Sequence, residues 1–123
     1  MKLYHFTHAD VEVLKVNQFG GHSWTDNDAE RNKIPRLFFY LTTKPREWFF
    51  KNAAFRYDVQ IDTCKLYDFR HDPKKLRDKF NCNIPLILEY CKRHYKGVIY
   101  TSGSFDAVSL FYDVKPIKKI RRH

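Results

Sequence analysis

The sequence predicts an α+β domain: a split β-sheet core with short helices and a basic helical insertion. Residues 2–7, 36–43 and 53–61 supply strands, because apolar and polar residues alternate there as they do in half-buried strands, and further strands are expected over 97–101 and 108–113. The stretch between these two groups of strands has helical spacing and many lysines and arginines. Strands at both ends with helices between them are typical of the α+β class. A chain of 123 residues with 43% hydrophobic residues is long enough for one core, so we expect a single domain over residues 1–123.

The first elements along the chain are predicted to be a strand, a short helix and a loop. Residues 2–7 alternate as a strand does. Residues 9–15 are predicted to be helical, because Val11 and Leu14 are spaced for one helical face. Residues 23–35 are polar without apolar periodicity, which indicates a loop.

Two further strands and a helix are predicted in the middle of the chain. Residues 36–43 form the second strand, and a short helix over 45–50 follows because proline is favoured in a first turn. Residues 53–61 alternate clearly and form a third strand. Residues 66–69 are a candidate for a short fourth strand.

The last part of the chain is predicted to hold two helices and three strands. Residues 73–80 indicate a basic helix, and residues 85–95 a second helix with one apolar face. Strands are expected over 97–101 and 108–113, and a short edge strand over 116–120.

The charge of the chain favours a polyanionic partner. The formal net charge is +9 at pH 7, and the basic residues gather in three clusters, at 73–79, 92–96 and 118–122. A solvated helix face is the ordinary explanation for one such cluster. Three clusters interleaved with aromatic residues indicate contact with DNA, RNA or a nucleic-acid-associated protein.

Cysteine usage and hydropathy indicate the compartment. The three cysteines form no Cys-x-x-Cys pair and match no zinc spacing, which is typical of reduced thiols, and the histidines show no metal-binding spacing. No apolar run approaches the ~20 residues of a membrane helix, and the chain begins with a polar strand rather than a signal peptide. We therefore expect a cytoplasmic monomer without metal or membrane contact, in the host cytoplasm if the source is a virus.

Two short segments carry the candidate site. His5 and Thr7 in the first strand, and Tyr40 and Thr42 in the second, stand two residues apart, so each pair shares one sheet face. A buried strand face usually carries aliphatic residues. Two strands that present an imidazole, hydroxyls and an aromatic ring on one surface predict a ligand groove.

These segments resemble a known family. The chain resembles the ADP-ribosyltransferase superfamily in four segments: "LYHFT" at the start, a Gly-Gly loop, "FFYLTTKPREW", and the late "GVIYTSGSFDAVSLFYDVKPIKKI". Within this superfamily it most resembles the small diphtheria-toxin-like or poly(ADP-ribose)-polymerase-like members. The resemblance covers residues 1–62 and 96–120 but not the basic stretch between them. It implies an ADP-ribosyltransferase-like split sheet, NAD as cofactor, and transfer of a single ADP-ribose to a protein or nucleic-acid acceptor.

The resemblance also implies roles for individual residues. His5 would bind a hydroxyl of the ribose next to nicotinamide, with Thr7 close to the same ribose and the backbone of Phe6 paired with the carboxamide. Tyr40 would stack on the nicotinamide ring, where a pyridinium adds a cation–π attraction. Thr42 follows Tyr40 in the same groove.

Other residues remain open for the stacking and phosphate positions. Phe39 replaces Tyr40 if the register is shifted by one, and Tyr57 is a weaker candidate for the same groove. Arg31, with Lys33 and Arg36, is a candidate for the pyrophosphate, because arginine suits phosphate oxygens.

The catalytic carboxylate is the position at which this sequence departs from the family. Transferases of this kind carry a glutamate that stabilises the positive charge developing as nicotinamide leaves. Counting from Tyr112-Asp113, that position falls on Val108. Asp106 is the best stand-in, but two residues correspond to ~6.6 Å of strand, so a bulge would be needed.

The leading hypothesis is an NAD-dependent mono-ADP-ribosyltransferase with His5, Tyr40 and Asp106 as catalytic residues. The alternative is a catalytically degenerate module that binds nucleic acid, nucleotide or a partner protein, for example a small viral inhibitor of a host enzyme. A relative of the RNA 2′-phosphotransferases is a further alternative, for which this chain offers only Arg31 and Arg36.

Overall fold

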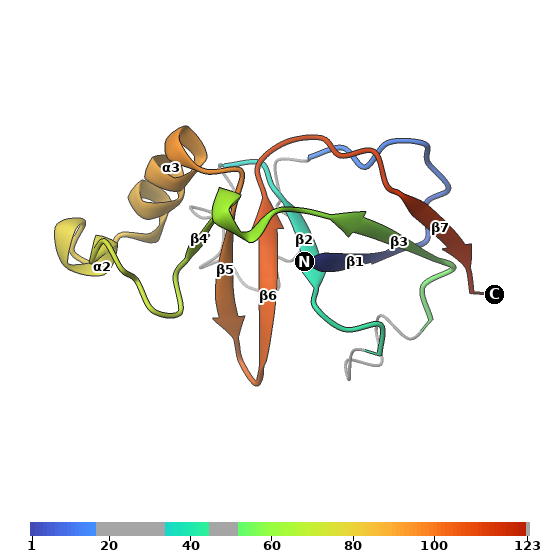
Figure 1. The fold of residues 1–123 in the computed structure, drawn as a ribbon, viewed down its shortest axis with the longest axis horizontal. Coiled ribbons are helices and arrows are strands. Elements are labelled where there is room, and N and C mark those ends of the chain that lie inside the picture. Colours follow the sequence, from blue (N-terminus) through green and yellow to red (C-terminus); the bar gives the residue numbers. More distant parts are fainter. Residues whose placement is uncertain (17–33, 45–51, 123) are drawn as a thin grey trace.

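The computed structural model describes residues 1–16, 34–44 and 52–122 (Figure 1). They form one seven-stranded sheet with the strand order β4-β5-β6-β2-β1-β3-β7. Neighbouring strands are antiparallel except β4 and β5, which are parallel. The strands are β1 (Lys2–Thr7), β2 (Leu37–Tyr40), β3 (Phe55–Gln60), β4 (Leu66–Asp68), β5 (Gly97–Ser102), β6 (Phe105–Leu110) and β7 (Lys118–Arg121).

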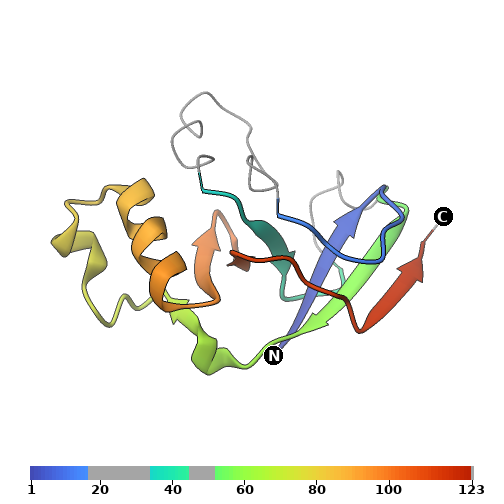
Figure 2. The ribbon, with the colours of Figure 1, turned by 90° about the horizontal axis from the view of Figure 1, so that it is seen from above.

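The α+β fold class predicted from the sequence is wrong: the described residues form a small β-rich fold with a mixed sheet. The two ends of the chain do not build separate halves of a split sheet, because β6 pairs directly with β2 and joins them into one. The basic insertion contributes only two short α-helices, α2 (Leu76–Lys79) and α3 (Ile84–His94). Both lie at the β4–β5 end of the sheet, away from β7 (Figures 1 and 2).

Most predicted elements are found, with shifted ends. The strand over residues 2–7 is confirmed, and the others are present as β2 to β7, with β6 beginning at Phe105 rather than 108. The helix predicted over 85–95 is α3, whose cap residue Asn83 accepts a hydrogen bond from the Leu86 N–H. The basic helix over 73–80 is reduced to α2. The helix over 45–50 and nearly all of the loop over 23–35 lie outside the described residues.

The helix predicted over residues 9–15 is wrong. This segment has no helical turn: it bends at Glu12 and Val13, and Leu14 pairs with Val114 in an isolated antiparallel bridge. The Leu14 N–H donates to the Val114 carbonyl at 2.8 Å, and the Val114 N–H donates back at 2.9 Å. We call residues 9–16 the strap, because they run over one face of the sheet.

The sheet buries a core on each of its faces. The face that the strap covers carries Leu3, Phe39, Tyr57, Val108 and Leu110, all fully buried. We call it the His5 face, since His5 lies there against Phe39. On the opposite face, which we call the helix face, buried residues of α3 pack against Tyr67, Val98 and Phe111.

Candidate functional site

The strap is held on the His5 face by one tyrosine of β3. The Tyr57 hydroxyl donates to the Ala9 carbonyl at 2.7 Å and accepts from the Val11 N–H at 2.9 Å. Its ring is 0% exposed, and both hydrogen bonds are partly buried. Together with the Leu14–Val114 bridge, they fix the strap at a distance from β1 that leaves space beneath it.

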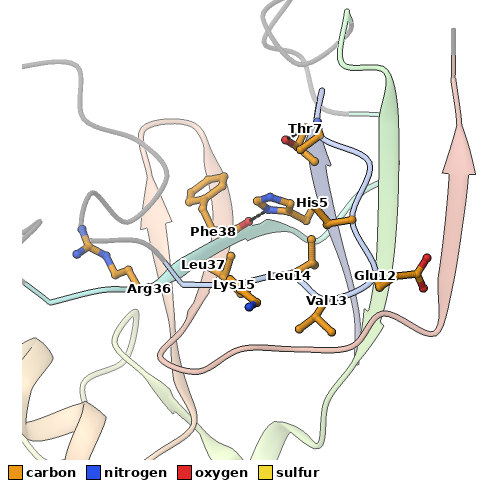
Figure 3. Close-up of a pocket in the computed structure, with 11 residues that line it drawn as sticks. His5, Thr7, Glu12, Val13, Leu14, Lys15, Arg36, Leu37 and Phe38 are labelled. Carbon is orange, nitrogen blue, oxygen red and sulfur yellow. Dashed lines mark hydrogen bonds between the residues drawn. The ribbon is translucent and has the colours of Figure 1, made fainter.

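This space is a pocket of about 550 Å³ between the strap, β1 and the start of β2 (Figure 3). Pockets of this size bind small molecules or cofactors. The polar and charged residues in its lining are His5 and Thr7 of β1, Glu12 and Lys15 of the strap, and Arg36. Figure 3 shows Thr7 on one side of His5 and Lys15 and Arg36 on the other, with the Glu12 carboxylate pointing away from His5.

The hydrogen bond of His5 determines which of its ring nitrogens is available. Nδ1 lies 2.7 Å from the Phe38 carbonyl oxygen. A carbonyl only accepts, so Nδ1 carries the proton. Burial lowers the pKa of His5 below its usual 6.5, although the hydrogen bond to Phe38 acts in the opposite direction. The imidazole is therefore neutral at pH 7, and Nε2 is a hydrogen-bond acceptor.

This lowered pKa predicts a loss of stability in mild acid. Because the pKa of His5 is lower in the folded than in the unfolded state, the unfolded chain binds more protons below pH 6.5. We expect the free energy of unfolding to fall as the pH drops below 6.5, by at most about 1.4 kcal/mol per pH unit from this group. Urea unfolding of the wild type and of His5→Asn between about pH 7 and 5 measures it. Equal losses in both proteins would contradict the prediction.

Thr7 and Phe6 occupy the two sides of β1. Thr7 lines the pocket beside His5, and its hydroxyl accepts a hydrogen bond from the Ala9 N–H at 3.2 Å. The Phe6 side chain points to the helix face, where it packs against Tyr40. His5 and Thr7 are thus the predicted pair that the structure brings together.

Tyr40 lies on the opposite face of the sheet from His5. It is the register partner of Tyr4, so its side chain shares the helix face, and its ring is 3% exposed between Phe6 and Phe38. The structure therefore does not bring Tyr40 and His5 into one groove. Thr42 lies beyond the end of β2 in an exposed bend, where its hydroxyl accepts from the Lys44 N–H.

The alternatives for the aromatic position are on the correct face but buried. Phe39 packs against the His5 ring with centroids 5.5 Å apart, yet it is 0% exposed and so offers no face to a ligand. Tyr57 is equally buried and holds the strap. Arg31 lies outside the described residues.

The position expected for the carboxylate belongs to the hydrophobic core. Val108 is the register partner of Phe39, and it is 0% exposed. A valine in this place packs against the core residues of the His5 face and offers no charge to a ligand.

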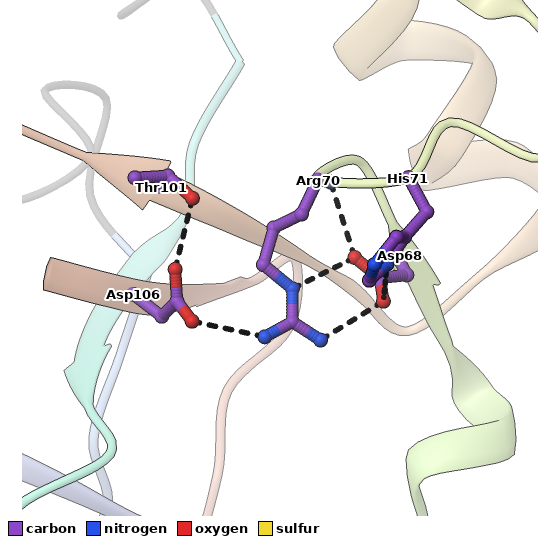
Figure 4. Close-up of polar contacts among 5 residues, drawn as sticks. All are labelled: Asp68, Arg70, His71, Thr101 and Asp106. Carbon is purple, nitrogen blue, oxygen red and sulfur yellow. Dashed lines mark hydrogen bonds and ion pairs between the residues drawn. The ribbon is translucent and has the colours of Figure 1, made fainter.

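Asp106 lies near the start of β6, where it takes part in a cluster of ion pairs and hydrogen bonds (Figure 4). Its carboxylate accepts from the Thr101 hydroxyl at 2.8 Å and from Arg70 Nη1 at 2.9 Å, and these contacts lower its pKa. Arg70 also binds both carboxylate oxygens of Asp68, which holds the pKa of Asp68 far below its usual range. Asp106 is not among the residues that line the pocket.

Sequence reasoning missed Lys15 and Glu12 as residues of the pocket lining. Both lie on the strap, which the apolar spacing assigned to a helix. Arg36 was named for a pyrophosphate and does line the pocket, where its Nη1 donates to the Ile34 carbonyl at 3.1 Å.

Neither the described residues nor the similarity of the chain to other proteins identifies a metal centre, a membrane-spanning helix or a family. Among the described residues, no group of three or more histidines, cysteines, aspartates or glutamates is arranged to hold a metal ion. Within residues 1–16, 34–44 and 52–122, no helix is long and apolar enough to cross a membrane. No protein-family model matches the chain, and neither does any curated protein or solved structure.

Proposed function

We propose that the protein binds NAD in the pocket beneath the strap. The ribose next to nicotinamide would lie against His5 and Thr7, and the pyrophosphate would lie toward Lys15 and Arg36. The single observation that carries this proposal is the neutral His5, with its Nε2 acceptor beside a hydroxyl in a pocket of about 550 Å³. The polyanionic partner favoured by the net charge of +9 remains part of the proposal, as a second ligand bound elsewhere.

The chemistry of the lining matches the two parts of the ligand. A ribose presents hydroxyl groups, which donate to a neutral imidazole nitrogen and exchange hydrogen bonds with a threonine hydroxyl. A pyrophosphate presents charged oxygens, for which arginine and lysine are the usual partners. In the pocket lining, the Thr7 hydroxyl lies on one side of His5, and the cationic side chains of Lys15 and Arg36 lie on the other (Figure 3).

Binding without transfer is better supported than an ADP-ribosyltransferase reaction. Transfer requires an anion beside the ribose as nicotinamide leaves. Val108 fills the expected position and is fully buried, while Asp106 is engaged by Arg70 and Thr101. Mono-ADP-ribosyl transfer to a protein or nucleic acid stays a prediction from the resemblance.

Calorimetric titration with NAD tests the proposal with matched histidine variants. In His5→Asn the side-chain amide can still donate to the Phe38 carbonyl, but no atom stands at the Nε2 position. We expect roughly tenfold weaker NAD binding, the usual cost of one lost hydrogen bond. His5→Gln, whose amide reaches the Nε2 position, should retain more affinity than His5→Asn.

The control for this titration is His8→Asn. His8 is exposed, lies in the same part of the chain and is not part of the pocket lining, so the variant should bind NAD as the wild type does. Absence of saturable NAD binding by the wild type, or equal binding by His5→Asn, would overturn the proposal. Incubation with labelled NAD completes the test, because an ADP-ribosylated product would contradict binding without transfer.

A further inference from the structure

The second surface of interest is the pair of helices at the β4–β5 end of the sheet (Figures 1 and 2). Between residues 71 and 96 the chain has seven lysines and arginines against three aspartates and glutamates. This segment therefore carries a formal net charge of +4 out of the total of +9. Such a local excess attracts polyanions.

Aromatic rings lie directly beside these cations. Lys79 Nζ is 4.9 Å from the centre of the Tyr90 ring and 5.5 Å from that of Phe80. The Phe80 and Tyr90 rings are 5.9 Å apart, and Tyr90 is followed along α3 by His94, with ring centres 4.4 Å apart. The three rings and the lysine thus form one continuous row across α2 and α3.

A second cation–ring pair extends this row. Lys74 Nζ lies 5.5 Å from the centre of the Tyr95 ring. The lysines and His94 are exposed, and the other rings are half-buried, so each ring is held by packing and still reaches solvent. We call this set the aromatic–cation strip; it consists of Lys74, Lys79, Phe80, Tyr90, His94 and Tyr95.

Two of the nearby acidic side chains are engaged elsewhere and do not neutralise the strip. Glu89 forms an ion pair with Arg93 at 3.1 Å. Asp72 accepts hydrogen bonds from the Leu76 and Arg77 N–H groups and from the Tyr67 hydroxyl. Asp78 is the third acidic residue, and with all three counted the seven lysines and arginines between residues 71 and 96 still leave this surface positive.

We propose that the aromatic–cation strip binds single-stranded nucleic acid. The lysines contact backbone phosphates, and unpaired bases stack on Tyr90 and its neighbouring rings. A single strand is favoured over a duplex, because paired bases are stacked on one another and cannot lie on a protein ring. The strip belongs to α2 and α3, whereas the NAD pocket lies between the strap and β1, so the two proposals are independent.

Fluorescence anisotropy with labelled oligo(dT) over a range of salt concentrations tests this surface. The wild type should bind oligo(dT) more tightly than a duplex of the same length. Each phosphate contact contributes about 0.7 to the slope of log affinity against log salt for a single strand. Lys74→Gln combined with Lys79→Gln should therefore reduce the slope by about 1.4. Tyr90→Leu should weaken binding roughly tenfold and leave the slope unchanged.

The charge-matched control combines Lys2→Gln with Lys118→Gln. Both residues are exposed, and they lie on β1 and β7, away from the strip. This variant should retain the affinity of the wild type. Equal weakening by the control would show that net charge alone drives binding, and duplex binding as tight as oligo(dT) binding would show that stacking is absent. Either result, or no saturable oligo(dT) binding, would overturn the proposal.

Discussion

Gly97→Ala is expected to lower the free energy of unfolding by about 3 kcal/mol or more, because the methyl group has no space. Gly97 opens β5 between Leu66 of β4 and Leu110 of β6. A Cβ atom there would lie 2.4 Å from the Ser109 carbonyl oxygen and 2.7 Å from a Leu110 methyl group. The first of these contacts is with backbone, so relief requires the strands to separate. Urea unfolding followed by circular dichroism measures the loss.

Gly103→Ala is the matched control for this prediction. Gly103 has a φ of +62°, and a Cβ added to it would meet nothing within 4 Å. The substitution therefore carries only the backbone strain of a left-handed conformation, about 1 kcal/mol. A Gly97→Ala protein as stable as Gly103→Ala would show that β4, β5 and β6 are not packed as described.

Tyr57→Phe is expected to have the second largest effect, a loss of about 2–4 kcal/mol. The variant retains the buried ring but removes the hydroxyl that binds the Ala9 carbonyl and the Val11 N–H. Two backbone groups would lose their partner, and the strap would be held mainly at Leu14. We therefore also expect weaker NAD binding, since the strap forms one wall of the pocket. Urea unfolding and calorimetric titration measure the two effects.

Tyr100→Phe provides the comparison for Tyr57→Phe. The Tyr100 hydroxyl is hydrogen-bonded to the Ser109 side chain at 3.2 Å rather than to backbone. Its removal should cost about 1 kcal/mol and leave NAD binding unchanged. A Tyr57→Phe protein with wild-type stability and NAD affinity would contradict the role assigned to the strap.

The strands could be predicted from the sequence because alternation is a local property. The strap could not, because its conformation depends on contacts distant along the chain. Val11 and Leu14 suit a helical face, but the Val11 N–H donates a hydrogen bond to the Tyr57 hydroxyl, 46 residues away, and Leu14 pairs with Val114. The α+β fold class was wrong because the apolar spacing overstated the helices: the helix predicted over 73–80 is only the four-residue α2, and residues 9–15 form no helix.

The candidate site was predicted within one strand but not between strands. Spacing of two residues correctly placed His5 and Thr7 on one face, because that follows from strand geometry alone. The face of Tyr40 depends on which residue of β1 stands opposite, and a shift of one residue reverses it. The ion pair between Asp106 and Arg70 could not be predicted either, because the two residues are 36 positions apart and nothing in the sequence around Asp106 indicates it.

The strand order has a consequence for how the chain folds. β5 and β6 are consecutive and meet through the turn at Gly103, so their pairing closes a short loop. By contrast, the strap, which forms one wall of the His5 pocket, is held by the bridge between Leu14 and Val114, which lie 100 residues apart. Pairing between distant segments forms late, because loop closure opposes it until other contacts compensate. The walls of the His5 pocket therefore come together only when the longest-range pairings are complete, and ligand binding there reports on the fully folded molecule.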